Sequence, residues 1–209
     1  MIDPDTLDWA KMDGLVPAIV QDAASGEVRM LGYMDRAALE ATLRDRLVTF
    51  YSRSRGWLWR KGETSGNVLK LIDVKLDCDR DAVLVLANPV GPTCHTGSPS
   101  CFGDDGAPGT GFVATLAANI AERAGADPSS SYTARLIAEG VKRIAQKVGE
   151  EGVEVALAAT AGDADELTAE AADLVYHLSV LLEASGSSWE AVIAELKRRH
   201  AASSATASS

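Results

Sequence analysis

The sequence predicts two domains of different fold class, an α+β domain over residues 1–109 and an all-α domain over residues 110–200. Three observations support this division. The first half holds 7 of the 11 aromatic residues and several short runs of strand-forming type. In the second half, apolar residues recur every three or four positions, which is the period of a helix. Between the halves, residues 97–111 are rich in glycine, proline and aspartate, which is typical of a domain boundary.

The elements predicted in the first half form a β-rich sheet with one short helix. Residues 14–22 and 25–31 are expected to form two strands joined by a turn. Residues 35–43 are expected to form a helix that Asp35 caps at its N-terminus. The other strand-like runs are residues 48–52, 57–60, 68–78 and 82–87. Together these elements make a sheet-rich α+β unit.

The second half is expected to be entirely helical. Ile137, Val141, Ile144 and Val148 are separated by four, three and four positions, and the same spacing recurs over residues 167–181. The expected helices cover residues 112–124, 132–148, 150–161, 164–185 and 188–199. The tail, residues 201–209, is small and polar, so we expect it to be disordered.

The composition is that of an ordinary globular protein and not of a disordered chain, with 46% hydrophobic and 24% charged residues. A net charge of -10 and the lack of a basic cluster argue against nucleic-acid binding. No run of about 18 apolar residues occurs, so no membrane span is expected. The acidic N-terminus lacks the pattern of a signal peptide, and we expect a cytoplasmic protein. In that reducing compartment, three cysteines favour metal binding or burial over disulfides.

Asp77, Asp79 and Asp81 follow a predicted strand and would share one of its faces if the strand continued. Crowded carboxylates repel one another unless they are protonated or bridged by a cation, and oxygen ligands favour Mg²⁺ or Ca²⁺. The pattern therefore indicates a site for a divalent cation. The alternative is a solvated acidic turn.

The thiols of Cys78, Cys94 and Cys101 are ligands of the kind that zinc favours. Three thiolates would leave a fourth position open for water, whose pKa zinc lowers to about 7. His95 is either a fourth ligand that closes the site or a general base beside that water. The spacing of Cys94 and Cys101 is not that of a zinc finger, and buried cysteines without a metal are the alternative.

Several segments of the first half together resemble the phosphoribosyl-AMP cyclohydrolase family: residues 14–22, 30–34, 49–55, 58–67, 77–81 and 91–101. The resemblance covers nearly all of residues 8–103. It implies Zn²⁺ on Cys78, Cys94 and Cys101, and Mg²⁺ on Asp77, Asp79 and Asp81. It also implies a homodimer whose zinc ligands come from both subunits. One departure is Arg60, which stands where many relatives carry an apolar or hydroxyl residue.

The reaction implied by this resemblance is hydrolytic opening of an adenine ring between N1 and C6. Activated water attacking a ring carbon is chemistry that zinc supports. His95 is the candidate for proton transfer to the ring nitrogen. The candidate phosphate contacts are Arg53, Arg55, Lys61, Ser65 and Asn67. The alternative for these residues is a charged strand face followed by a tight turn.

The second half carries carboxylates at helical spacing. Glu151 and Glu154 would share one helix face, as would Glu170 and Asp173, because residues three apart are neighbours. Glu150 lies on the flank. Two such helices packed antiparallel would bring four carboxylates together, and that cluster could hold Mg²⁺ and, through it, pyrophosphate oxygens. The alternative is a pair of solvated acidic helix faces.

This pattern resembles the MazG-like, all-α NTP pyrophosphohydrolases. A longer resemblance, over about residues 112–200, is to the phosphoribosyl-ATP pyrophosphatase family, and residues 131–133, 143–151, 170–178 and 198–200 carry it. It implies Mg²⁺ on Glu150, Glu151, Glu154, Glu170 and Asp173, with Glu151 and Glu154 also catalytic. Lys147 is expected to contact the triphosphate. His177 either supports a ligand or is a hydrogen-bonded histidine of the bundle.

The two resemblances imply consecutive reactions: Mg²⁺-dependent release of pyrophosphate from phosphoribosyl-ATP by the second half, and ring opening of phosphoribosyl-AMP by the first half. The product of the second half's reaction is the substrate of the first half's, so the order of catalysis reverses the order along the chain. Three alternatives remain: one inactive domain, a helical half that hydrolyses nucleotides broadly, and a non-enzymatic zinc-binding assembly module.

Overall fold

The computed structural model of the chain describes the backbone of residues 2–206 and the side chains of residues 2–202. The chain divides into two compact units. The boundary in the sequence lies between Phe112 and Val113, just after the 3₁₀ turn η3 (Gly109–Gly111). Among the described residues, none of the helices is long and apolar enough to span a lipid bilayer.

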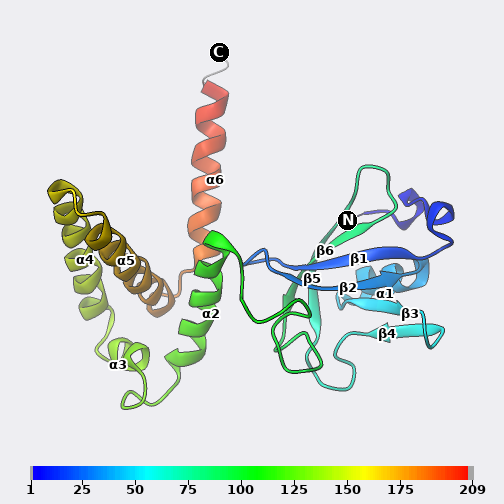
Figure 1. Ribbon diagram of the computed structural model, residues 1–209, viewed down its shortest axis with the longest axis horizontal. Coiled ribbons are helices and arrows are strands. Elements are labelled where there is room, and N and C mark those ends of the chain that lie inside the picture. Colours follow the sequence, from blue (N-terminus) through cyan, green and yellow to red (C-terminus); the bar gives the residue numbers. More distant parts are fainter. Residues whose placement is uncertain (1, 207–209) are drawn as a thin grey trace. The chain divides into compact units, whose positions relative to one another are not determined.

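The N-terminal unit is a mixed sheet with one helix, as expected (Figure 1). Its sheet has the order β2-β1-β6-β5; the strands are β1 (Val16–Asp22), β2 (Val28–Met34), β5 (Leu69–Leu76) and β6 (Val83–Pro89). β1 runs antiparallel to β2 and parallel to β6, and β5 runs antiparallel to β6. The other elements are α1 (Arg36–Asp45), the hairpin of β3 (Thr49–Ser52) and β4 (Trp57–Arg60), and the 3₁₀ turns η1 (Pro4–Thr6) and η2 (Trp9–Met12).

The core of this unit follows from the alternation of side chains along the strands. In β1, Val16, Ala18 and Val20 point to one face and are fully buried. Asp35 caps α1, because its carboxylate accepts the backbone N–H of Ala38 at 2.7 Å. The ring of Phe50 is 1% exposed and stacks on Trp59 with the ring centroids 5.7 Å apart. The apolar pattern of the sequence thus sets which sheet face is covered.

The C-terminal unit is helical throughout its described part, as expected. Its helices are α2 (Phe112–Ala124), α3 (Tyr132–Ala138), α4 (Val141–Ala161), α5 (Ala164–Ala184) and α6 (Trp189–Thr206). Only a short turn at Gly162 and Asp163 separates α4 from α5, and the two helices form an antiparallel hairpin (Figure 1). The small buried core contains Ile120, Leu136, Ile144 and Val180.

Two expectations about the helices are corrected. Gly140, whose φ is 90°, lies between α3 and α4 and separates them into two helices. α4 then continues without interruption through Gly149. The ~1 kcal/mol cost of a glycine does not break a helix of that length. At the C-terminus, α6 continues to Thr206, so residues 201–206 are helical rather than disordered, in keeping with the high helix propensity of their alanines. Residues 207–209 of the expected tail lie outside the described residues.

Gly32 in β2 provides a test of the core. A Cβ at this position would lie 2.4 Å from the Phe50 ring, which is buried and cannot move without repacking. We expect Gly32→Ala to lower the free energy of unfolding of the N-terminal unit by about 1–3 kcal/mol, measured by chemical denaturation. Gly125→Ala, where a Cβ would meet nothing within 4 Å, is the control. Wild-type stability of Gly32→Ala would contradict this packing.

Candidate functional site

The N-terminal unit contains a cavity of about 470 Å³ between the end of β4 and the loop that follows β6. Several residues predicted from the sequence line it: Arg55, Lys61, Ser65, Asn67, Cys94, His95 and Cys101. Arg53 is not among the lining residues. Its guanidinium stacks on the ring of Tyr33, 3.7 Å from the centroid. The structure thus brings most of the predicted side chains to one cavity.

Glycines fix the turn that carries Ser65 and Asn67. Gly62 and Gly91 have φ values of +82° and +74°, which favour glycine. A Cβ on Gly62 would lie 2.4 Å from the backbone of Asn67, and one on Gly91 would lie 2.7 Å from its side-chain oxygen. Only glycine permits this close approach, so the turn between β4 and β5 holds Asn67 at the cavity wall.

Cys94 and Cys101 lie close together at the two ends of one loop. The N–H of Cys94 donates to the carbonyl of Ser98 at 3.0 Å, which closes the loop. Thr96 Oγ1 donates to Cys94 Sγ at 3.1 Å, and this bond is the main reason that the pKa of Cys94 is lowered. Burial, followed by the neighbouring Cys94, raises the pKa of Cys101, and the charge of buried Lys61 partly opposes that rise.

Two further polar groups lie at the same cavity. His95 Nδ1 is 3.8 Å from Cys94 Sγ, so the imidazole stands beside the thiol pair. Thr93 is 2% exposed, and its Oγ1 has no hydrogen-bond partner among the described residues. A buried hydroxyl without a partner is unfavourable, so a ligand in the cavity would satisfy it.

Cys78 stands apart from the thiol pair. It is exposed, follows β5, and is not among the residues that line the cavity. Its Sγ lies 4.0 Å from Asp79 Oδ1. Among the described side chains, no group of clustered metal-binding donors combines the three thiols. One chain therefore presents two thiols together and the third elsewhere.

Asp77, Asp79 and Asp81 do come together, with carboxylate oxygens within 4.8 Å of one another. They were expected to share one face of a continued strand, and this expectation is corrected. β5 ends at Leu76, and residues 77–81 form a turn. The turn is stable because Asp77 Oδ1 accepts the backbone N–H groups of Asp81 and Ala82 at 3.0 and 3.1 Å.

Lys11 provides the countercharge of this turn, and sequence reasoning missed it. Its Nζ lies 2.6 Å from Asp81 and also contacts Asp79. The hydrogen bond from Lys11 is the main reason that the pKa of Asp79 is lowered. Because Lys11 and Asp79 are 68 positions apart, no local pattern could have indicated the contact.

In the helical unit, Glu151 and Glu154 of α4 meet Glu170 of α5, with carboxylate oxygens within 4.8 Å. Desolvation, and then the charges of Glu154, Glu151 and Asp173, raise the pKa of Glu170. Asp173 therefore neighbours the group without belonging to it. Glu150 lies on the flank, where its carboxylate accepts from Lys147 at 2.9 Å and from Gln146 at 2.8 Å.

Glu151 is the buried member of this group, at 4% exposure. Lys147 Nζ lies 2.8 Å from its Oε1, and this hydrogen bond is the main reason that the pKa of Glu151 is lowered. His177 Nδ1 lies 2.9 Å from the carbonyl of Asp173 and 3.4 Å from Glu151. Both neighbours are acceptors, so Nδ1 carries a hydrogen, and the other ring nitrogen, Nε2, lies 3.2 Å from Tyr132 Oη. His177 therefore faces the carboxylates.

Comparison with known families assigns the two units separately. Residues 30–103 match the sequence model of the phosphoribosyl-AMP cyclohydrolase family. Residues 113–200 match that of the phosphoribosyl-ATP pyrophosphohydrolase family. The cavity with the thiol pair lies within the first match and the Glu151 cluster within the second.

Curated relatives extend the similarity over most of the chain. It is 58% identical over 200 residues to the histidine biosynthesis bifunctional protein HisIE of Photobacterium profundum, covering 93% of this chain and 97% of that one. The HisIE proteins of Vibrio cholerae and Escherichia coli K12 are each 59% identical; the matches cover 94% and 93% of this chain, and 94% and 95% of theirs. The chain therefore belongs to the family of histidine biosynthesis bifunctional enzymes, hydrolases that join a cyclohydrolase domain to a pyrophosphohydrolase domain.

Proposed function

We propose that the helical unit hydrolyses phosphoribosyl-ATP to phosphoribosyl-AMP and pyrophosphate, and that the N-terminal unit then opens the adenine ring between N1 and C6. The observation that carries this proposal is the agreement between two family matches and two units, each with its own cluster of metal-binding side chains. The product of one unit is the substrate of the other.

In the helical unit, Glu151, Glu154 and Glu170 would hold Mg²⁺, with Asp173 beside them. Carboxylate oxygens suit this ion, and a single lysine leaves the cluster with an excess of negative charge. Magnesium held there would supply charge neutralisation for the triphosphate. Lys147 adds a positive charge for the phosphates, and Glu150 holds that lysine in place. Glu151 and Glu154 orient the water that attacks phosphorus and accept its proton.

His177 supports this arrangement through its contacts with Glu151 and the backbone of Asp173. Its Nδ1–H is directed at the Asp173 carbonyl and towards Glu151, while Tyr132 fixes the other ring nitrogen. Such partners orient the side chains that bind a metal. His177 therefore orients Glu151 without touching the substrate.

In the N-terminal unit, Cys94 and Cys101 would hold Zn²⁺ together with Cys78 of a second copy. The donor chemistry fits, because thiols favour this ion and two of them already lie close together. Zinc held there would supply the Lewis acidity that activates water at neutral pH. His95 stands beside the thiol pair and transfers a proton to the ring nitrogen.

Substrate contacts in this cavity follow from charge and hydrogen bonding. Arg55 and Lys61 bind the phosphate, because they bring positive charge to the cavity wall. Ser65, Asn67 and the unpartnered Thr93 hydroxyl donate to the sugar and phosphate oxygens. Arg53 requires a turn away from Tyr33 before it could join them. Mg²⁺ would be held beside Cys78 by Asp77, Asp79 and Asp81. The Lys11 ammonium would first have to leave its ion pairs with these carboxylates.

A homodimer explains the separated thiols. One chain alone offers the pair of Cys94 and Cys101 but leaves Cys78 exposed on another element. The sheet also has exposed apolar side chains that a partner could cover; Ile19 and Leu31, paired across β1 and β2, are 37% and 46% exposed.

Complementation tests the shared zinc site. Cys78→Ala and Cys101→Ala should each lower ring opening more than about 100-fold, since both remove a ligand. Mixing the two variants under conditions of subunit exchange should restore activity. Random exchange makes half of the dimers mixed, each with one complete site of two, so about a quarter of the wild-type rate is expected.

The control for this mixture is Cys94→Ala with Cys101→Ala, two residues of the same thiol pair. A mixed dimer of those variants has no complete site and should stay inactive. Ring opening that returns in the control mixture, or fails to return in the first, would contradict a site built from Cys78 of one copy and the pair of the other.

Glu154→Gln tests the helical site. Loss of a carboxylate that binds the metal should lower pyrophosphate release from phosphoribosyl-ATP more than about 10-fold, and it should weaken Mg²⁺ binding. Ring opening of supplied phosphoribosyl-AMP should persist. Glu183→Gln, at an exposed position near the end of α5, is the matched control and should keep both activities. Unchanged pyrophosphate release in Glu154→Gln would remove Glu154 from the site.

A further inference from the structure

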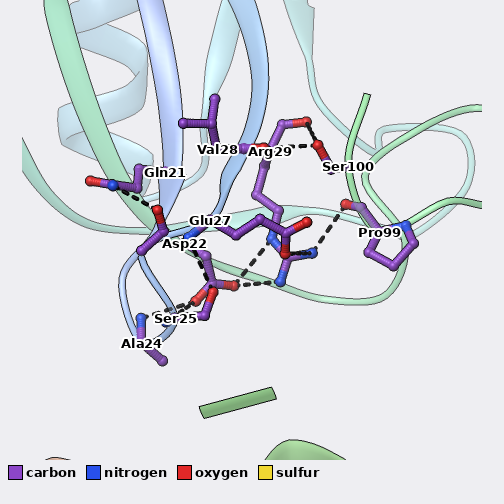
Figure 2. A network of polar contacts seen from close by, with 10 residues as sticks. Gln21, Asp22, Ala24, Ser25, Glu27, Val28, Arg29, Pro99 and Ser100 are labelled. Carbon is purple, nitrogen blue, oxygen red and sulfur yellow. Dashed lines mark hydrogen bonds and ion pairs between the residues drawn. The ribbon is translucent and has the colours of Figure 1, made fainter. Parts of the chain in front are cut away.

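The turn between β1 and β2 contains a cluster of buried charges that the proposed chemistry does not use. The side chains of Asp22, Glu27 and Arg29 are only 8%, 10% and 14% exposed. Arg29 donates from Nη2 and Nε to Asp22 Oδ2 at 2.7 and 3.2 Å, and its Nη1 lies 3.1 Å from Glu27 (Figure 2). A buried ion cluster adds little stability over apolar residues of the same size. The more informative question is therefore which part of the chain the cluster binds.

This cluster holds the loop that ends in Cys101. Arg29 Nη1 donates to the carbonyl of Pro99 at 3.2 Å, as Figure 2 shows, and that carbonyl also accepts the N–H of Thr93. The carbonyl of Arg29 accepts the N–H of Cys101 at 2.8 Å. Ser100 Oγ donates to the carbonyl of Val28 at 2.8 Å. The first two residues of β2 therefore bind three consecutive residues, 99–101, which lead up to and include Cys101.

We propose that Arg29 is a positioning residue for Cys101. Held by Asp22 and Glu27, its guanidinium fixes the Pro99 carbonyl and so sets where the Cys101 thiol stands relative to Cys94. Gly97 inside this loop and Gly103 just after Cys101 have φ values of +95° and +126° and offer no steric restraint of their own. The zinc consequence rests on the proposed function, whereas the placement of the thiol does not.

The geometry of the cluster calls for arginine. Asp22 is oriented by the N–H groups of Ala24 and Ser25, both 2.9 Å from its Oδ1, so only Oδ2 faces Arg29. Burial by itself raises the pKa of Asp22, but the bonds from Ser25 and Arg29 outweigh it and the pKa is lowered. The planar guanidinium serves two carboxylates and a carbonyl at once, and a lysine ammonium lacks this fork of donors.

The test measures where the thiol stands. In the metal-free, full-length protein, iodoacetamide modification of Cys101 is followed by mass spectrometry, with Cys78 as the reference thiol on a different element. Arg29→Met should raise the ratio of Cys101 to Cys78 modification several-fold, because the loop loses the side-chain hydrogen bond to the Pro99 carbonyl. Zinc affinity, measured by competition with a chelator, should fall about 10- to 100-fold. Arg29→Lys should recover only part of both losses.

Two further variants separate positioning from general stability. Val85→Ala destabilises the same unit from within β6 and should leave the modification ratio unchanged. Asp22→Asn with Glu27→Gln and Arg29→Met removes both ion pairs without leaving an unpaired buried carboxylate, so this triple variant provides a folded protein if Arg29→Met alone does not. Its modification ratio should rise as in Arg29→Met.

The proposal is overturned if the triple variant keeps the wild-type modification ratio, or if Val85→Ala changes that ratio as much as the triple variant does. Failure of the proposed zinc site gives a different result: Cys101→Ala would bind zinc as tightly as the wild type. In that case the modification ratios still decide whether Arg29 positions the thiol.

Discussion

Like charges held within a few ångströms of one another need a countercharge, and this requirement governs both halves of the molecule. In each unit, three carboxylates place oxygens within 4.8 Å of one another. In each, one lysine approaches them, Lys11 at the turn after β5 and Lys147 on α4. A single positive charge leaves most of the three negative ones unbalanced, and a divalent cation would add two more positive charges. The turn between β5 and β6 and the hairpin of α4 and α5 bring these carboxylates together.

For the thiols, the governing constraint is their position and not their charge. Cys94 and Cys101 share one loop, and hydrogen bonds hold that loop to the start of β2. Cys78 belongs to the aspartate turn, away from the cavity. One chain therefore carries the parts of the proposed zinc site on two separate pieces of surface. Ring opening at the proposed zinc site would therefore require both dimerisation and loop anchoring, whereas the carboxylate cluster of the helical unit lies within a single hairpin.

Features governed by local patterns could be predicted from the sequence. The helical period predicted α5, the strand-forming run over residues 14–22 predicted β1, and the rule for residues three apart brought Glu151 and Glu154 together. Features that depend on distant contacts could not. Lys11 meets its aspartates across 68 positions, and Arg29 meets Pro99 across 70. The break at Gly140 was missed because the apolar period continues through it, and only the backbone conformation of that glycine ends α3.

The measurement that bears most directly on this account is to supply the purified chain with phosphoribosyl-ATP, Mg²⁺ and Zn²⁺, and to follow pyrophosphate and the ring-opened product together. Two consecutive activities at separate sites predict that pyrophosphate appears first and that the ring-opened product follows after a lag. Pyrophosphate without ring opening, even with supplied phosphoribosyl-AMP, would contradict the role given to the thiol cavity. Equal pyrophosphate release from ordinary deoxynucleoside triphosphates would contradict the substrate assigned to the helical unit.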